Sequence, residues 1–145
     1  DLISSVKYNG VMVIDVTVPF KEGNAVIAAR DASGKILWSW HIWLTDQPEA
    51  QVYNNNAGTM MDRNLGATSA TPGDVGALGL LYQWGRKDPF LNSSQIYDYY
   101  GEYTAKSTLS WPSAVGSNSS RGTIDYVTAN PTTYVYASSS NANDW

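Results

Sequence analysis

A β-hairpin predicted between residues 25 and 43 constrains the fold of this chain more than any other segment. Two strand-like stretches, residues 25–30 and 35–43, flank Asp-Ala-Ser-Gly at positions 31–34. Gly34 can take the left-handed conformation that closes a three-residue loop with a bulge. The register that follows places Ala28 opposite Trp38 and Val26 opposite Trp40, so that small side chains face the two indoles.

One face of this hairpin is predicted to be buried, because side chains alternate between the two faces of a strand. The predicted core face carries Val26, Ala28, Ile36, Trp38, Trp40 and Ile42, and the opposite face carries Ala25, Ile27, Leu37, Ser39 and His41. Burying two indoles of about 200 Å² each contributes on the order of several kcal/mol, at about 25 cal/mol per Å². We therefore expect Trp38 and Trp40 to be structural residues.

Three further stretches read as strands. Residues 11–18 are β-branched and alternate, with Met12, Ile14 and Val16 on one side, and the stretch ends at Pro19. Residues 60–65 predict a short strand that leads into a turn at Gly66, and residues 132–137 alternate as another strand. The polar segment 45–58 reads as a linker.

Two short helices are predicted. Residues 77–84 place apolar side chains at helical spacing, and Gly85 stands where a helix end favours glycine, so we expect a two-turn helix that buries the Trp84 indole. Thr123 can cap a second helix at residues 124–129, which must end before Pro131. Residues 92–120 have no sustained period and read as long loops.

Composition narrows the classes of function. Only 15% of the 145 residues are charged, and the chain has six Trp and ten Tyr against two Phe. This balance is typical of a secreted or cell-surface β-rich module. The net charge is −4 with scattered basic residues, which argues against a nucleic-acid partner. Without cysteine there is no disulfide, thiolate zinc site or cysteine nucleophile.

The sequence contains no window of about 18 apolar residues that would cross a bilayer. Because the chain starts at Asp1, we expect it to be processed or trimmed, and any lipid anchor or signal peptide to lie outside it. Contact with a membrane is therefore expected only through such an anchor.

Three motifs in order carry a resemblance to a known family. They are KILWSWHIW at residues 35–43, MDRNLGA at 61–67 and LYQWGRKDPF at 81–90. Together they resemble the major paralogous domain of Fibrobacter succinogenes, as found in fimbrillin-like surface and pilus proteins of Bacteroidetes. The resemblance covers roughly residues 36–145. It implies an extracellular module with a fold similar to the group of C-type lectin-like and sulfatase-modifying domains.

The resemblance also sets expectations for domain organisation. In the family, a further segment with late core strands follows the region that corresponds to residues 143–145, so we expect this chain to be a fragment or to be completed by a second chain. The predicted fold class is α+β and strand-dominated. An antiparallel hairpin or meander, residues 1–44, would end a β-sandwich, and residues 45–145 would form a truncated, loop-rich lectin-like domain with two short helices.

The charged residues of the second and third motifs have two interpretations. Arginine forks suit carboxylate and sulfate ligands, so these residues could form a ligand site. Buried charges persist when they are paired, and we favour a structural ion-pair network with Arg63 and Asp88 as partners. The residues assigned a structural role are Trp38, Trp40, Asp62, Arg63, Trp84, Arg86 and Asp88.

Aromatic residues in the loops are the candidates for ligand contact. Tyrosine combines a large apolar ring with a hydroxyl and loses little entropy on binding. The candidates are Tyr97, Tyr99, Tyr100, Tyr103 and Trp111, together with Trp43, which we place on the hairpin face opposite to Trp38 and Trp40. Simple packing of the loops is the competing interpretation.

Catalysis and metal binding are not expected. His41 is the only histidine, and a triad with Ser110 or Ser113 has no support from the sequence pattern. Calcium is conceivable at the Asn-rich and Asp-rich stretches, but their spacing matches no calcium loop, so we predict neither a cofactor nor a metal site. An enzyme related to the sulfatase-modifying fold is disfavoured because cysteine is absent.

Two functions remain as hypotheses. The first is a non-catalytic adhesin-like module at a cell surface or pilus, which contacts a glycan or a surface protein through Tyr-rich and Trp-rich loops. The alternative is a structural fimbrial subunit whose sheet pairs with a strand of a neighbouring protomer.

Overall fold

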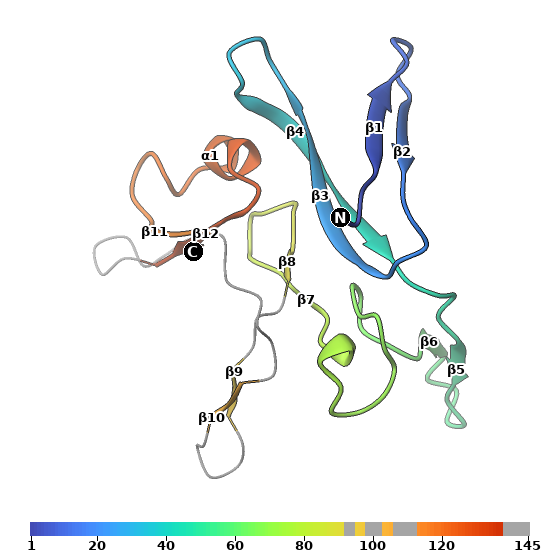
Figure 1. The fold of residues 1–145 in the computed structure, drawn as a ribbon. Coiled ribbons are helices and arrows are strands. Elements are labelled where there is room, and N and C mark those ends of the chain that lie inside the picture. Colours follow the sequence, from blue (N-terminus) through green and yellow to red (C-terminus); the bar gives the residue numbers. More distant parts are fainter. Residues whose placement is uncertain (92–94, 98–102, 106–112, 138–145) are drawn as a thin grey trace.

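Short strands dominate the computed structural model, which describes residues 1–91, 95–97, 103–105 and 113–137 (Figure 1). Within these residues the strands form two-stranded sheets, accompanied by one α-helix and a turn of 3-10 helix. The strands are β1 (Ser5–Tyr8), β2 (Ile14–Thr17), β3 (Gly23–Arg30), β4 (Ile36–Leu44), β5 (Ala50–Val52), β6 (Thr59–Met61), β7 (Leu80–Leu81), β8 (Phe90–Leu91), β9 (Gln95–Tyr97), β10 (Tyr103–Ala105), β11 (Ser113–Gly116) and β12 (Thr133–Tyr136). The helix α1 spans Ile124–Ala129 and the 3-10 helix spans Val75–Ala77. The strand-dominated character predicted from the sequence is confirmed.

The first hairpin pairs β1 with β2, and the sequence analysis found only its second strand. Tyr8 pairs with Ile14 in an antiparallel register. The predicted strand begins at Ile14 instead of residue 11, because Met12 lies in the connecting turn with a φ of 64° and is exposed. Ile14 and Val16 are half-buried and share one face, as predicted.

The second hairpin, β3 and β4, has the predicted turn. The Asp31 carboxylate accepts hydrogen bonds from the main-chain N–H groups of Ser33 at 2.9 Å and Lys35 at 3.0 Å, and Gly34 has a φ of 86°. Arg30 pairs with Ile36, as predicted. The next pair away from the turn is Ala29 with Trp38, so β4 has an extra residue, a bulge, at this point. An extra residue in one strand moves every later partner by one position, which also exchanges the faces.

The bulge makes the predicted core face of the hairpin wrong. Trp38 pairs with Ala29 and Trp40 with Ile27, not with Ala28 and Val26. Trp38 is 48% exposed and Trp40 is 37% exposed, so neither indole is buried as predicted. The face that carries Ser39 turns inward instead, and Ser39 is only 3% exposed.

The helix predicted at residues 77–84 does not form. The Leu80 N–H donates to the Leu65 carbonyl at 2.8 Å, and β7 then pairs with β8. Gly79 lies so close to this neighbouring segment that a Cβ there would be 2.5 Å from the Asn64 Cβ. Pairing across the chain therefore outweighs a local helical pattern that is already weakened by glycine. The segment read as a linker, residues 45–58, likewise contains β5, which pairs with β6.

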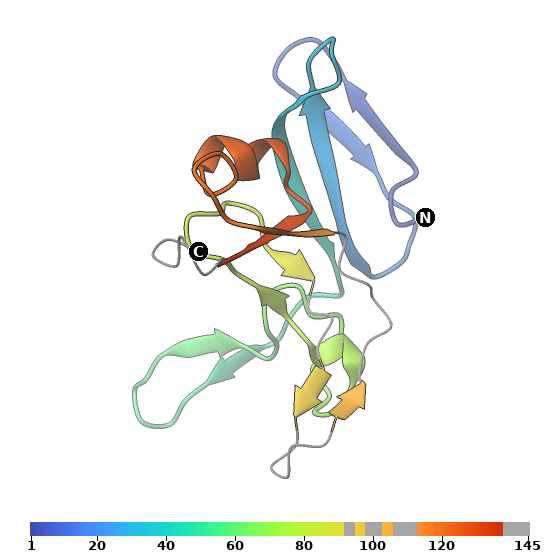
Figure 2. The same ribbon diagram turned by 90° about the vertical axis from the view of Figure 1, so that its left-hand side faces the viewer.

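The predicted helix and strand near the end of the described chain are confirmed. The Tyr126 N–H donates to the Thr123 hydroxyl at 3.2 Å, which caps α1. β12 lies parallel to β11, and α1 forms part of the connection between them. Figure 2 shows α1 against the β3–β4 hairpin, and contacts between α1 and β4 confirm this packing.

The buried apolar side chains of the described residues all come after the β3–β4 hairpin in the chain. They are Ala67, Phe90, Val127 and Val135. The boundary predicted after residue 44 stays a prediction, and hydrogen bonds from Asn24, Ser39 and Trp43 to later residues cross it.

Candidate functional site

The inner face of β4 is fixed to the segment that follows β7 by a compact charged cluster. The Ser39 hydroxyl donates to an Asp88 carboxylate oxygen at 2.8 Å, and the Lys87 ammonium donates to the same carboxylate at 2.7 Å. Lys87 also donates to the Ser39 carbonyl at 2.8 Å and lies 4.3 Å from the Trp38 ring centroid. Because Asp88 is buried and its negative charge is paired with Lys87, the cluster stabilises the contact between β4 and the segment before β8.

Arg63 forms a separate cluster and does not pair with Asp88, which corrects the partnership expected from the sequence. Its guanidinium donates to Asp62 at 2.9 Å, to the Thr45 hydroxyl at 3.0 Å and to Asp46. These hydrogen bonds lower the pKa of both carboxyl groups. The Arg63 side chain is nearly buried, so the cluster ties the end of β4 to the turn before Gly66.

A third set of hydrogen bonds joins β3 and β4 to residues 66–67. The Trp43 indole N–H donates to the Ala67 carbonyl at 3.1 Å, and the Asn24 amide donates to the Gly66 carbonyl at 2.8 Å. Trp43, a candidate for ligand contact, is therefore half-buried with its polar group engaged. His41 Nε2 lies 2.9 Å from Asn24 Oδ1, and burial lowers the His41 pKa although the nearby Asp88 charge opposes this.

Two side chains close the free edge of β12. The Arg86 guanidinium donates to the Thr133 carbonyl at 2.5 Å, and the Gln83 side-chain amide donates to the Val135 carbonyl. Carbonyls two residues apart in a strand point to the same edge, so these donors take the place of a neighbouring strand. Arg86 also lies over the Phe90 ring, with its guanidinium carbon 4.6 Å from the ring centroid.

The same two anchors hold a tight turn that presents aromatic side chains, which we call the aromatic turn (residues 82–86). The Arg86 N–H donates to the Gln83 carbonyl at 3.1 Å, and Gly85 has a φ of 72°, as the third residue of a type II turn requires. Trp84 occupies the corner and is 87% exposed, and Tyr82 is 63% exposed. The predicted burial of Trp84 is wrong, because the turn directs Gln83 inward instead.

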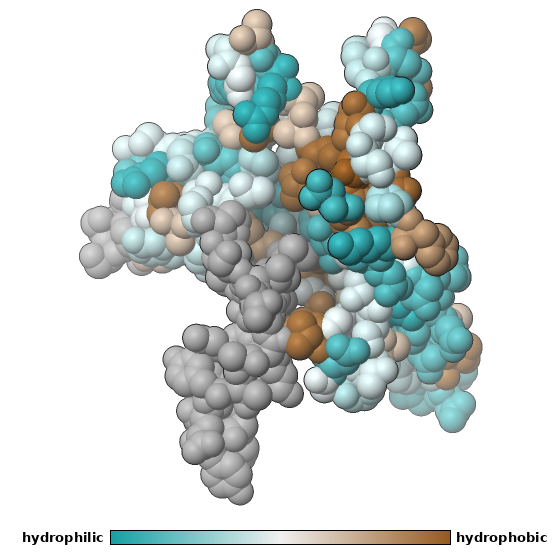
Figure 3. All heavy atoms as spheres, viewed as in Figure 1, coloured by the Kyte–Doolittle hydropathy of each residue, from teal (hydrophilic) through white to brown (hydrophobic). Residues whose placement is uncertain are grey.

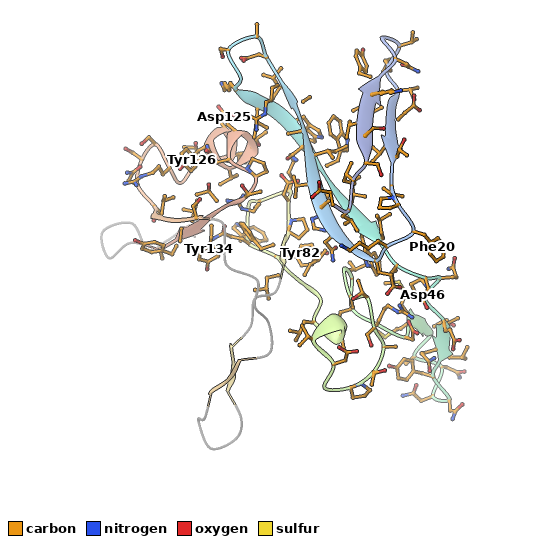
Figure 4. All side chains as sticks on the ribbon, in the orientation of Figure 1. Phe20, Asp46, Tyr82, Asp125, Tyr126 and Tyr134 are labelled. Carbon is orange, nitrogen blue, oxygen red and sulfur yellow. The ribbon has the colours of Figure 1, made fainter. Side chains whose placement is uncertain are left out.

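The sequence analysis did not name Tyr82 and Gln83 as candidate site residues. A signal was present, since Trp-Gly between two polar residues suits the centre of a type II turn as well as the end of a helix. Because the segment was interpreted as a helix, the Trp84 indole was predicted to be buried. Figure 4 shows Tyr82 between β7 and β8, and Tyr134 on β12.

Tyrosines of β12 extend the exposed aromatic surface beside this turn. Tyr134 and Tyr136 alternate with the buried Val135, and both are partly exposed. The Tyr134 ring meets the buried Phe90 ring edge-on, with centroids 5.6 Å apart. The hydrogen bond from Gln83 to β12 brings the aromatic turn next to this strand.

The loop residues predicted to contact a ligand fall mostly outside the described part of the chain. Tyr99, Tyr100 and Trp111 lie outside the described residues. Tyr97 on β9 and Tyr103 on β10 are backbone partners in an antiparallel pair. Their role in binding therefore stays a prediction.

No catalytic arrangement arises from the polar groups that the structure describes. The Ser113 hydroxyl donates to the Thr133 hydroxyl at 2.8 Å, while His41 binds Asn24, so these two residues serve separate networks. Ser39 lies beside Lys87, as in a serine–lysine pair, but Ser39 is buried and the Lys87 ammonium is engaged in an ion pair with Asp88. Ser110 lies outside the described residues.

The described residues contain no group of three or more His, Asp or Glu side chains placed to hold a metal ion. No helix in this part of the chain is long and apolar enough to cross a membrane. Comparisons with protein-family models, curated proteins and solved structures found no match to this chain.

Proposed function

We propose that the protein is a non-catalytic binding module of a bacterial cell surface or pilus, and that it contacts a glycan or a surface protein through exposed aromatic side chains. The observation that carries this proposal is the aromatic turn, where Trp84 is almost fully exposed while Gln83 before it and Arg86 after it are fixed to β12. The family resemblance of the three motifs supports an extracellular module with a lectin-like fold in residues 45–145.

The anchoring of the turn favours binding because it removes much of the entropy cost. Gln83 and Arg86 hold the main chain on both sides of Trp84, so a ligand does not have to order the loop. An indole face stacks on the apolar C–H face of a sugar ring or on an apolar side chain. The Tyr-rich loops of residues 97–111 are proposed to add further contacts to the same ligand.

A glycan array, read with and without calcium, tests this function. We expect binding that falls at least tenfold in Trp84→Ala, and also in Tyr99→Ala and Trp111→Ala if the loops take part. Tyr53→Ala is the matched control, because Tyr53 is another exposed aromatic residue, next to β5 and away from the aromatic turn. Equal binding by the Trp84 and Tyr53 variants would contradict the proposal.

A structural fimbrial subunit is the second candidate, favoured by the open edges of the longest hairpin. β3 and β4 pair only with each other among the described strands. An apolar groove of about 590 Å³ lies between this hairpin and β1–β2, lined by Val6, Tyr8, Ile14, Ile27 and Trp40 among others. Figure 3 shows the hydrophobic residues that gather between these two hairpins. A strand of a neighbouring protomer could add to such an edge.

Sedimentation velocity at increasing protein concentration separates the two candidates. A structural subunit would form growing oligomers that persist in Trp84→Ala and are lost in Val6→Lys, which places a charge in the groove. Val52→Lys, on β5, is the control for an added surface charge. Oligomers unaffected by Val6→Lys would rule out assembly through this groove.

A further inference from the structure

The loop between β2 and β3 exposes a phenylalanine completely. Phe20 follows Pro19 at the end of the first hairpin, and its side chain is fully accessible. The Lys21 N–H donates to the Pro19 carbonyl at 2.8 Å, which holds the loop in a tight turn around Phe20. Figure 4 shows Phe20 at the end of β3 and β4 where the chain enters residue 46, with Asp46 close by. An aromatic ring held in full contact with water beside other apolar side chains is suited to anchor a docking partner.

A shallow hollow of about 480 Å³ lies beside this ring. Its lining combines apolar residues, Val18, Pro19, Phe20 itself and Leu44, with the charged residues Lys21, Glu22 and Asp46. The same surface therefore carries both a protruding ring and a hollow with room for one.

The charges around the hollow are of both signs. Lys21 forms no ion pair within the described part of the chain, and its neighbour Glu22 is held in place because its carboxylate accepts the Asp46 N–H at 3.1 Å. Asp46 itself has a mostly exposed side chain. Because the Asp46 carboxylate is already paired with Arg63, the ammonium of Lys21 and the carboxylate of Glu22 are the charges that a copy of this surface can match.

We propose that this surface docks a second copy of the chain in a two-fold dimer. A two-fold axis beside the loop places each Phe20 in the hollow of the other copy and each Lys21 opposite the other Glu22. Such a contact is isologous and closes at two subunits. A contact limited to one loop and the adjacent hollow belongs to the small, weak class of interfaces, below about 1,200 Å² in total, so the dimer is expected only at high protein concentration. Strand addition along a sheet edge would instead give open-ended oligomers.

Sedimentation equilibrium over a concentration series tests the dimer, since all the substituted side chains are exposed and circular dichroism can confirm that each variant keeps its fold. Because two rings are lost per dimer, Phe20→Ala is expected to weaken dimerisation about 100-fold. Tyr53→Ala is the control and leaves the dimer unchanged.

A charge swap tests the orientation of the two copies. Lys21→Glu or Glu22→Lys alone juxtaposes like charges and abolishes the dimer, whereas the double variant K21E/E22K restores the opposite pairing and recovers it. A chain that stays monomeric up to about 1 mM, or a dimer that Phe20→Ala leaves intact, overturns the proposal. A double variant that stays monomeric overturns the two-fold pairing of Lys21 with Glu22.

Discussion

Replacing Arg86 with methionine tests whether the framework behind the aromatic turn depends on side chains that close the edge of β12. Methionine keeps the length and the apolar contact with Phe90 but removes every donor. The Arg86 Nε donates to the side-chain oxygen of Gln83 at 3.2 Å. The guanidinium also makes three bonds to main-chain carbonyls: one to Thr133 at 2.5 Å and two weaker ones to Asn130 and Pro131, both at 3.3 Å.

The expected cost follows from these three bonds. A hydrogen bond to a charged group contributes about 1.5–3 kcal/mol, and a buried carbonyl left unpaired costs about 1–3 kcal/mol. One strong bond and two long ones that share a single nitrogen give a total of about 3 kcal/mol. Small domains are stable by only about 5–15 kcal/mol, so Arg86→Met removes a large fraction of the stability.

Urea unfolding followed by tryptophan fluorescence measures this loss. Arg30→Met is the matched control, because Arg30 is exposed and its guanidinium makes one hydrogen bond, to the Gly34 carbonyl at 3.2 Å, and we expect a change within about 0.5 kcal/mol. The aromatic turn also loses an anchor in Arg86→Met, so ligand affinity falls although Trp84 is present. If the two methionine variants unfold at the same urea concentration, the reasoning about the β12 edge is refuted.

Three more predictions concern the framework. Gly66→Ala destabilises the fold by about 2 kcal/mol more than Gly34→Ala, because both glycines have a φ near 85° but only the first has a side chain within 3 Å of the added Cβ; equal melting temperatures would contradict this. Trp43→Phe costs about 1–3 kcal/mol in urea unfolding by leaving a buried carbonyl unpaired, while Trp84→Phe has no effect on stability. Burial holds the His41 pKa below its usual 6.5, so the unfolded chain binds more protons than the folded chain as the pH falls below 6.5. The free energy of unfolding is therefore expected to decrease as the pH falls below 6.5. His41→Gln is expected to flatten this dependence of the urea midpoint on pH.

Several features of the fold were accessible from the sequence because they depend on a few neighbouring residues. The turn at Asp31 and Gly34 is made by hydrogen bonds within five residues, and Thr123 caps α1 from the position next to it. Gly66 and Gly85 both take the left-handed conformation. In each case the required backbone conformation is one that the local residue types favour by themselves.

Contacts between distant segments decided the rest. A single bulge beside Arg30 exchanged the faces of the longest hairpin and left Trp38 and Trp40 partly exposed, and no local signal marks the register of two paired strands. Arg63 pairs with Asp46, and not with Asp88, because the end of β4 lies beside it in space, while its other partner, Asp62, is its neighbour in the sequence.

The candidate site shows the same division. The sequence by itself determined that aromatic side chains gather with Arg86 and Lys87 in residues 81–90, and that Gly85 ends or turns a secondary-structure element there. Only the tertiary structure decided which of them face the solvent, because the carbonyls of β12 draw Gln83 and Arg86 inward and so turn Trp84 outward. The carbonyl groups at a free strand edge require hydrogen-bond donors from elsewhere in the chain. The sequence alone does not show which residues supply these donors, because that depends on where the strand lies in the fold.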